Sequence, residues 1–335
     1  MFTRRKALGL LLAGSAAYAA TYPYGTPAYD ETLVREPNEY QKAFIKKLAP
    51  LYDYLCFGDT DHRRELSKFV LGAPMLDTLA ATGITRVMME YAPRLSHLFD
   101  PGMPRKKFLH ICASNLVPAW TCGRERKENV CRILDEAITN GHDIRLVPVD
   151  RRFETHSIEG PPGGQRILLI PFSLALTASL AFHGCVDEPI FELAKPFMDE
   201  ESLLLDDRAT VEAIQGLSKP SAIFYGAGHF KRSMTQKSIA NLLEQAGQAL
   251  CILNVYESLG DAERIDTPGD MPDVQLCMVK PGPADFTDPK GEAEMMAQKT
   301  GIYVRNHLLL PMLEEVIAEV DGRPISEAVP APQQG

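Results

Sequence analysis

Short apolar runs alternate with amphipathic segments along residues 52–320 of this chain. The apolar runs predict strands, and segments with apolar residues at helical spacing predict helices. Repeated strand–helix–strand units are typical of an α/β fold, with a mostly parallel central sheet flanked by helices. The predicted strands are 52–57, 84–89, 144–149, 221–225, 249–256 and 274–279, and the predicted helices are 65–81, 125–139, 233–245 and 307–320.

Glycine and proline positions refine these boundaries. Pro74 lies inside the first predicted helix, where it is expected to kink or split it. Gly83, Asn140-Gly141 and Gly247 follow the helical periodicities and predict helix ends.

The pattern predicts one α/β domain over residues 20–320, with an extended arm at 21–40 and a flexible tail at 321–335. Residues 160–217 show helical character only, which predicts an inserted helical subdomain or lid. Within it, Ile167–Phe182 is nearly uncharged. Because it is short and contains Pro171, we expect a buried helix, and contact with a membrane is expected only through this stretch.

Residues 1–19 resemble a twin-arginine signal peptide. Arg4-Arg5-Lys6 precedes a short apolar stretch, and Ala17-Tyr18-Ala19 is a small-x-small cleavage site. The sequence therefore predicts export to the periplasm, with an uncleaved N-terminal anchor as the alternative.

The composition narrows the function classes. The chain of 335 residues has a formal net charge of −9, which argues against a nucleic-acid partner because phosphate binding needs clustered basic residues. Its seven cysteines are an odd number without a CxxC pair, so we expect mostly buried thiols.

Ionisable residues follow four of the predicted strands. Parallel strands end at one edge of a sheet, where ligands of open α/β sheets bind. Imidazoles and carboxylates at this edge could act as a general base, with His62, His229 and Glu90 as ligands if a divalent metal is bound. The candidate residues are Asp59, His62, Glu90, Asp150 and His229.

Each of these residues also has a purely structural interpretation. Asp59 could cap the following helix, and a histidine after a glycine is often structural. The coincidence at four strand ends favours a site, and Arg151 and Arg232 are the candidates for binding substrate or an oxyanion.

Several cofactor and hydrolase motifs are missing from the sequence. Gly226-x-Gly228 is followed by Lys231 at the third glycine position, so NAD binding is not expected. The glycines at 160–164 lack the Gly-Lys-Ser/Thr of a P-loop, so a nucleotide is not expected either. The chain also lacks HExxH and GxSxG motifs.

Two motifs in this order resemble the erythromycin esterase, ChaN-like and Tiki/TraB superfamily. The first is Phe57-Gly58-Asp59-Thr60-Asp61-His62, which is followed by a predicted helix and by a predicted strand that ends in Glu90. The second is Ala222–Phe230, which contains Gly226-Ala227-Gly228-His229. Asp150 fits the third acidic strand end of that superfamily. Asp59 stands where the esterase branch has Glu.

The resemblance implies the fold and the position of the site, and its branches include hydrolases, metal-dependent proteases and haem-binding proteins. One hypothesis is a periplasmic hydrolase of ester or amide bonds in a small molecule or peptide, with or without a divalent metal. The alternative binds haem or another small ligand without catalysis, and a structural role is the third. The sequence leaves open whether the chain is an enzyme, and it does not indicate the oligomeric state.

Overall fold

The structure is a computed structural model that describes residues 36–60, 64–91, 93–104, 133–139, 143–151, 207–233, 237–256, 271–278 and 292–322. The predicted signal peptide, most of the predicted insertion, the apolar segment 167–182 and the C-terminal tail after 322 lie outside these residues. Their predictions, and the predicted domain boundaries, therefore stay predictions.

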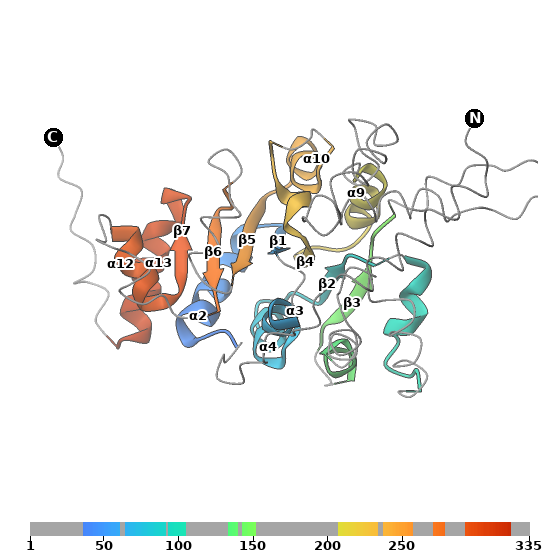
Figure 1. The fold of residues 1–335 in the computed structure, drawn as a ribbon, viewed down its shortest axis with the longest axis horizontal. Helices are drawn as coiled ribbons and strands as arrows, with labels where there is room; N and C mark the ends of the chain where they lie inside the picture. The colour runs from blue at the N-terminus through green and yellow to red at the C-terminus, as the bar shows by residue number, and fades with distance from the viewer. Residues whose placement is uncertain are drawn as a thin grey trace, which may run out of the picture. The chain divides into compact units, whose positions relative to one another are not determined.

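A seven-stranded sheet in the order β3-β2-β4-β1-β5-β6-β7 forms the centre of the described fold (Figure 1). Strands β1 to β6 run parallel, and β7 pairs antiparallel with β6. The predicted α/β fold with a mostly parallel sheet is confirmed. The strands are β1 (Tyr54–Asp59), β2 (Arg86–Met89), β3 (Arg145–Pro148), β4 (Ser221–Gly226), β5 (Leu250–Tyr256), β6 (Val274–Cys277) and β7 (Ile302–Val304).

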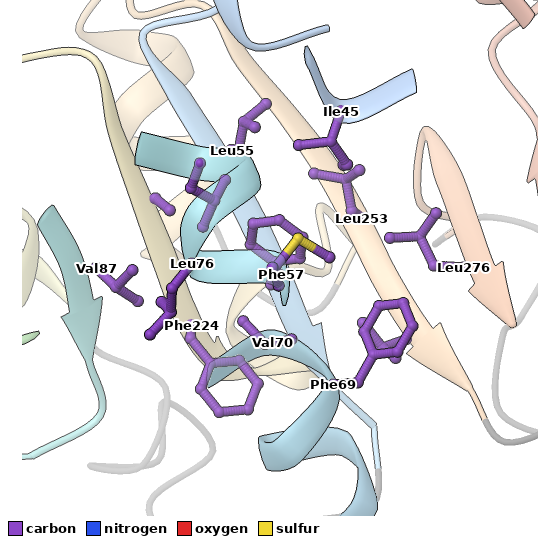
Figure 2. Close-up of a cluster of buried hydrophobic side chains, with 14 of the residues drawn as sticks. Ile45, Leu55, Phe57, Phe69, Val70, Leu76, Val87, Phe224, Leu253 and Leu276 are labelled. Atoms are coloured by element: carbon purple, nitrogen blue, oxygen red, sulfur yellow. The ribbon is translucent and has the colours of Figure 1, made fainter. Parts of the chain in front are cut away.

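Helices cover both faces of this sheet. Side chains alternate along each strand, so Leu55 and Phe57 of β1 pack into one apolar cluster and Tyr54 and Cys56 into another. Figure 2 shows part of the first cluster. It receives side chains from α2 (Glu39–Leu48), α3 (Arg64–Leu71), α4 (Ala73–Ala80) and α13 (Leu310–Val320), whereas the second receives them from α9 (Arg208–Gln215) and α10 (Ile239–Gln245).

The helix predicted over 65–81 is divided into α3 and α4. Gly72 separates them, and a Cβ there would lie 2.4 Å from the backbone oxygen of Lys68, so the close approach of the chain needs glycine. Pro74 lies in the first turn of α4, where the missing N–H costs nothing. The predicted helix is therefore split near Pro74, which is one of the two outcomes (a kink or a split) expected from the sequence.

Other helix boundaries differ from the predictions. The helix predicted over 233–245 begins at Ile239, because the Oγ of Ser238 accepts from the backbone N–H of Asn241 and caps it. The segment 307–320 is a 3₁₀ turn, η7 (His307–Leu309), followed by α13. The helix α2 was not predicted and begins within the predicted extended arm; α12 (Glu292–Thr300) and β7 were not predicted either.

The described cysteines behave as expected. Cys56, Cys251 and Cys277 are buried and form no disulfide within the described residues, and the other four cysteines lie outside those residues. Across the helices that the structure describes, none combines the length and apolar character that a bilayer crossing requires.

Candidate active site

Glu90 and His229 meet at the carboxyl edge of the sheet. Glu90 directly follows β2, and His229 lies in the 3₁₀ turn η5 (Ala227–Phe230) that follows β4, the neighbouring strand. The Nε2 of His229 lies 3.9 Å from Oε1 of Glu90. The other carboxylate oxygen, Oε2, accepts a 2.8 Å hydrogen bond from the backbone N–H of Gly226. The structure thus brings these two of the predicted residues together.

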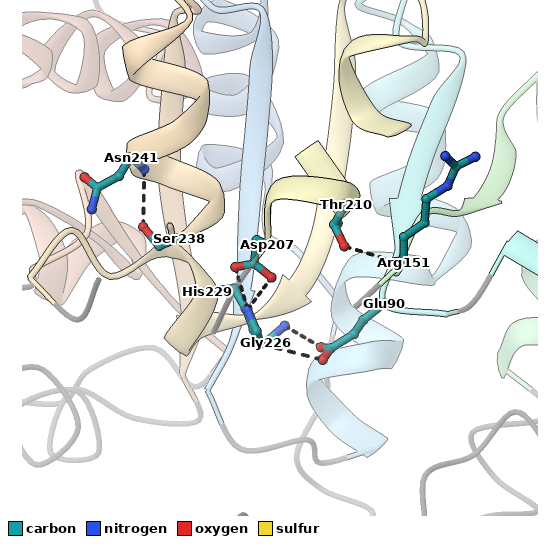
Figure 3. Close-up of polar contacts among 8 residues, drawn as sticks. All are labelled: Glu90, Arg151, Asp207, Thr210, Gly226, His229, Ser238 and Asn241. Carbon is teal, nitrogen blue, oxygen red and sulfur yellow. Dashed lines mark hydrogen bonds and ion pairs between the residues drawn. The ribbon is translucent and has the colours of Figure 1, made fainter. Parts of the chain in front are cut away.

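Asp207 holds the opposite side of the His229 ring. Its Oδ1 and Oδ2 lie 3.0 and 2.8 Å from Nδ1 of His229. Figure 3 shows Asp207, His229 and Glu90 in a row, with the imidazole between the two carboxylates. A carboxylate at Nδ1 favours the tautomer with its proton on that nitrogen, so that Nε2 carries the lone pair.

Asp207 holds His229 instead of capping its own helix. It occupies the N-cap position of α9, yet its side chain makes no capping hydrogen bond. Its backbone N–H donates to the carbonyl oxygen of Lys237, which fixes the start of α9. Asp207 is completely buried. Since burying a carboxylate is costly unless it is well paired, this arrangement serves the His229 ring rather than helix stability alone.

Packing fixes the His229 ring further. Tyr225, which is buried at the end of β4, makes an edge-on ring contact with His229 at a centroid distance of 5.0 Å. His229 itself is 8 % exposed. The imidazole is therefore oriented by one carboxylate and one aromatic ring before any substrate arrives.

The geometry between His229 and Glu90 suits a bridging oxygen atom. A separation of 3.9 Å is too long for a direct hydrogen bond, but one oxygen atom can lie within hydrogen-bonding distance of both groups. A water there would donate one hydrogen to Nε2 and the other to the Glu90 carboxylate.

Two further predicted residues are buried near strand ends. Asp59 is the last residue of β1 and pairs in register with Gly226. Strand alternation places it on the face of Leu55 and Phe57, whereas His229 is held by Asp207 at the start of α9, a helix of the opposite face. Asp150 follows β3, and its backbone N–H donates to the carbonyl oxygen of Tyr91.

The predicted basic residues have different surroundings. Arg151 is exposed, and its backbone N–H donates to Oγ1 of Thr210, which ties the end of β3 to α9. Figure 3 shows its guanidinium directed away from Glu90. Arg232 pairs with Glu244 at 2.8 Å and with Asp273 at 3.7 Å. Burial lowers the pKa of Arg232, but the hydrogen bonds and charges of Glu244 and Asp273 raise it further, and the net direction is upward.

His62 lies outside the described residues, so its predicted approach to His229 stays a prediction. Among the residues that the structure does describe, no group of three or more His, Cys, Asp or Glu side chains is arranged to hold a metal ion. Glu90 and His229 alone would supply two ligands.

Sequence reasoning missed Asp207. The acidic pair Asp206-Asp207 immediately before an amphipathic segment was the available signal, and it is usually explained by helix capping. Its contact with His229, 22 residues further along the chain, depends on how α9 packs on β4. Local sequence patterns do not contain that information.

Comparison with known proteins gives distant structural similarity. No family model matches this sequence, and no curated protein matches it. Three solved structures are similar. The type III effector HopBA1 has 16 % identity, covering 64 % of this chain and 82 % of that one, with a TM-score of 0.33.

The second is ChaN of Campylobacter jejuni, described for its cofacial haem binding. It has 13 % identity over 63 % of this chain and 84 % of ChaN, with a TM-score of 0.37. The similarity to ChaN is distant. A Bacillus cereus protein has 12 % identity over 68 % of this chain and 72 % of that one, with a TM-score of 0.40. These values do not indicate what this chain binds or catalyses, and the predicted resemblance to the esterase and Tiki/TraB branches stays a prediction.

Proposed function

We propose that this chain is a periplasmic hydrolase of ester or amide bonds in which His229 is the general base. The observation that carries the proposal is the row Asp207–His229–Glu90. One buried carboxylate contacts Nδ1, and a second, anchored by a backbone N–H, lies 3.9 Å from Nε2. A base oriented by a third group is the arrangement that general-base hydrolysis needs.

In the proposed reaction a water molecule lies between Nε2 of His229 and the carboxylate of Glu90. Nε2 removes one proton as the water oxygen attacks the carbonyl carbon, and a tetrahedral intermediate forms. The imidazolium then returns the proton to the leaving oxygen or nitrogen as the bond to the carbonyl carbon breaks. The products are a carboxylic acid and an alcohol or amine. Asp207 and Glu90 stabilise the imidazolium through their negative charges.

A divalent metal could also activate the water, because a histidine with a carboxylate on Nδ1 is a common metal ligand. A metal there would lower the pKa of a bound water. The described residues supply two donors, Nε2 of His229 and Oε1 of Glu90, and His62 is the other predicted ligand. The steps above therefore use the side chains of this chain alone.

The test is hydrolysis of nitrophenyl esters and peptide anilides by the purified protein, with and without added Zn²⁺ or Mn²⁺. His229→Gln is expected to lower kcat about a hundredfold or more, as loss of a general base does. His307→Gln is the matched control, because His307 is exposed on η7. Equal rates for the wild type, His229→Gln and the control on every substrate would overturn the proposal.

Haemin titration tests the ligand-binding alternative on the same samples. A Soret shift that His229→Gln abolishes, together with no hydrolysis by the wild type, would replace the hydrolase proposal with haem binding through this imidazole.

A further inference from the structure

The helix α9 contacts the ends of two strands at the candidate site. Asp207, at its N-cap position, contacts Nδ1 of His229 in the turn after β4. Thr210, three residues later, accepts a 3.1 Å hydrogen bond at Oγ1 from the backbone N–H of Arg151, which follows β3. Figure 3 shows both contacts. Residues three apart share a helix face, about 4.5 Å apart along the axis, so one face of α9 makes both contacts.

Glu90 lies between these two contacts along the edge of the sheet. The strand order β3-β2-β4 puts β2, which Glu90 directly follows, between the strand before Arg151 and the strand before His229. If α9 moved along this edge, Asp207 would move relative to the His229 ring, whereas Glu90 would stay bonded to the backbone of β4. The hydrogen bond to the end of β3 opposes such a movement.

Thr210 is a polar residue in an apolar environment. Its side chain is completely buried, on the face of α9 that places Val211 and Ile214 in the second apolar cluster. A valine of the same shape would suit such a position. Because a buried hydroxyl costs stability unless it is hydrogen-bonded, the bond from the Arg151 N–H explains why this side chain is polar.

The contact between Asp207 and His229 depends on where α9 lies. Asp207 is completely buried at the start of this helix, and its carboxylate oxygens lie 3.0 and 2.8 Å from Nδ1. A catalytic group displaced by about 1 Å can lower a rate about a hundredfold. A small displacement of α9 would therefore be expected to affect the orientation of the imidazole.

We propose that Thr210 is a positioning residue of the candidate active site. Its bond to the end of β3 fixes α9, and α9 in turn fixes Asp207 against Nδ1 of His229. The inference rests on the proposed hydrolase function for its effect on the rate. Its effect on the imidazole is measured without any substrate.

Three variants separate the hydroxyl group from the shape of the side chain. Thr210→Val keeps the shape and removes the acceptor, whereas Thr210→Ser keeps the acceptor. Thr78→Val is the matched control, because Thr78 is a buried threonine of α4, on the opposite face of the sheet, whose Oγ1 donates to the carbonyl oxygen of Pro74 at 2.7 Å. Thermal unfolding of all three measures the loss of stability that each change causes by itself.

Kinetics with nitrophenyl esters give the first measurement. Thr210→Val is expected to lower kcat about tenfold to a hundredfold with little change in KM, because the base is misplaced while the substrate still binds. Thr210→Ser is expected to recover most of kcat. Thr78→Val is expected to leave kcat unchanged even if it unfolds at a lower temperature.

Nitrogen NMR of the chain with isotope-labelled histidine gives the second measurement. His229→Gln identifies the signals of His229 among those of the eight histidines. In mildly alkaline solution the wild type is expected to show the tautomer with its proton on Nδ1. Thr210→Val is expected to shift these signals towards a mixture of both tautomers, whereas Thr210→Ser and Thr78→Val keep the signals of the wild type.

Wild-type kcat and wild-type His229 signals in a folded Thr210→Val variant would overturn the inference, and so would equal losses in Thr210→Val and Thr210→Ser. If Thr210→Val does not fold, Thr210→Ala removes the same hydroxyl with less bulk and replaces it in both measurements. The expected change of the His229 signals in a chain whose wild type hydrolyses nothing would keep Thr210 as a positioning residue of the imidazole and would remove the proposed function alone.

Discussion

The backbone N–H of Gly226 donates to Oε2 of Glu90 at 2.8 Å, and this bond joins the ends of β4 and β2. It leaves Oε1 directed to His229, so one carboxylate is both a structural tie and a partner of the proposed base. The two roles can be separated by experiment.

Glu90→Gln is expected to fold like the wild type, because a glutamine oxygen can still accept from the Gly226 N–H. Without the negative charge, the imidazolium of His229 loses a stabilising partner, and kcat is expected to fall about tenfold or more. Steady-state kinetics and thermal unfolding measure the two effects. An unchanged kcat in a normally folded variant would exclude Glu90 from the reaction.

Asp207→Asn tests a positioning residue. The amide cannot hold the His229 tautomer as a carboxylate does, so kcat is expected to fall about a thousandfold while KM stays nearly constant. Asp207→Glu is the conservative comparison and should recover part of kcat. A change in KM alone, or equal loss in both variants, would argue for a purely structural role.

Gly58→Ala is expected to destabilise the fold by about 1–3 kcal/mol, as overpacking of a well-filled interior does. The added Cβ would meet Oδ1 of Asn254 at 2.1 Å and the Ala227 Cβ at 3.1 Å. In a chain that already carries Asn254→Ala, the Gly58→Ala substitution should be less destabilising. Chemical denaturation of the two single variants and the double variant measures this coupling. Strictly additive effects would show that the two residues do not compete for space.

Stability is expected to fall at alkaline pH because of buried acidic groups. Burial raises the pKa of Tyr54 to about 12 and raises the pKa of the Cys56 and Cys251 thiols. The folded pKa of Tyr54 lies above its unfolded value near 10, so its contribution is present below pH 10 and is lost as the pH rises towards 12.

Tyr54→Phe provides the control for this effect. The Tyr54 hydroxyl has no hydrogen-bond partner in the described structure, so its removal should cost little at pH 7 and should flatten the loss of stability between pH 10 and 12. Urea unfolding at several pH values measures both. A steeper loss in the variant would contradict the assignment.

Parts of this fold could be predicted from the sequence because their cause is local. The buried strands are apolar runs, and each of the six predicted strands lies within two residues of its observed ends. The short strand β7 and the helix α12 were missed, since Ile302–Val304 is too short to show a period and α12 has a weak apolar face.

The candidate site was predictable only in part. Glu90 and His229 could be brought together on the principle that parallel strands end at one edge. The contact of Asp207 with His229 could not be predicted in this way, because it depends on the packing of α9 against the turn after β4. The roles of Asp59, Asp150, Arg151 and Arg232 stay predictions.

The central strand has consequences for how the chain acquires its structure. β1 pairs with β4 and β5, whose residues come more than 160 positions later in the sequence. During synthesis the backbone N–H and C=O groups on both edges of β1 therefore have no partner strand until residues 221–256 have left the ribosome. We expect slow, late sheet closure and a need for chaperone protection of the growing chain.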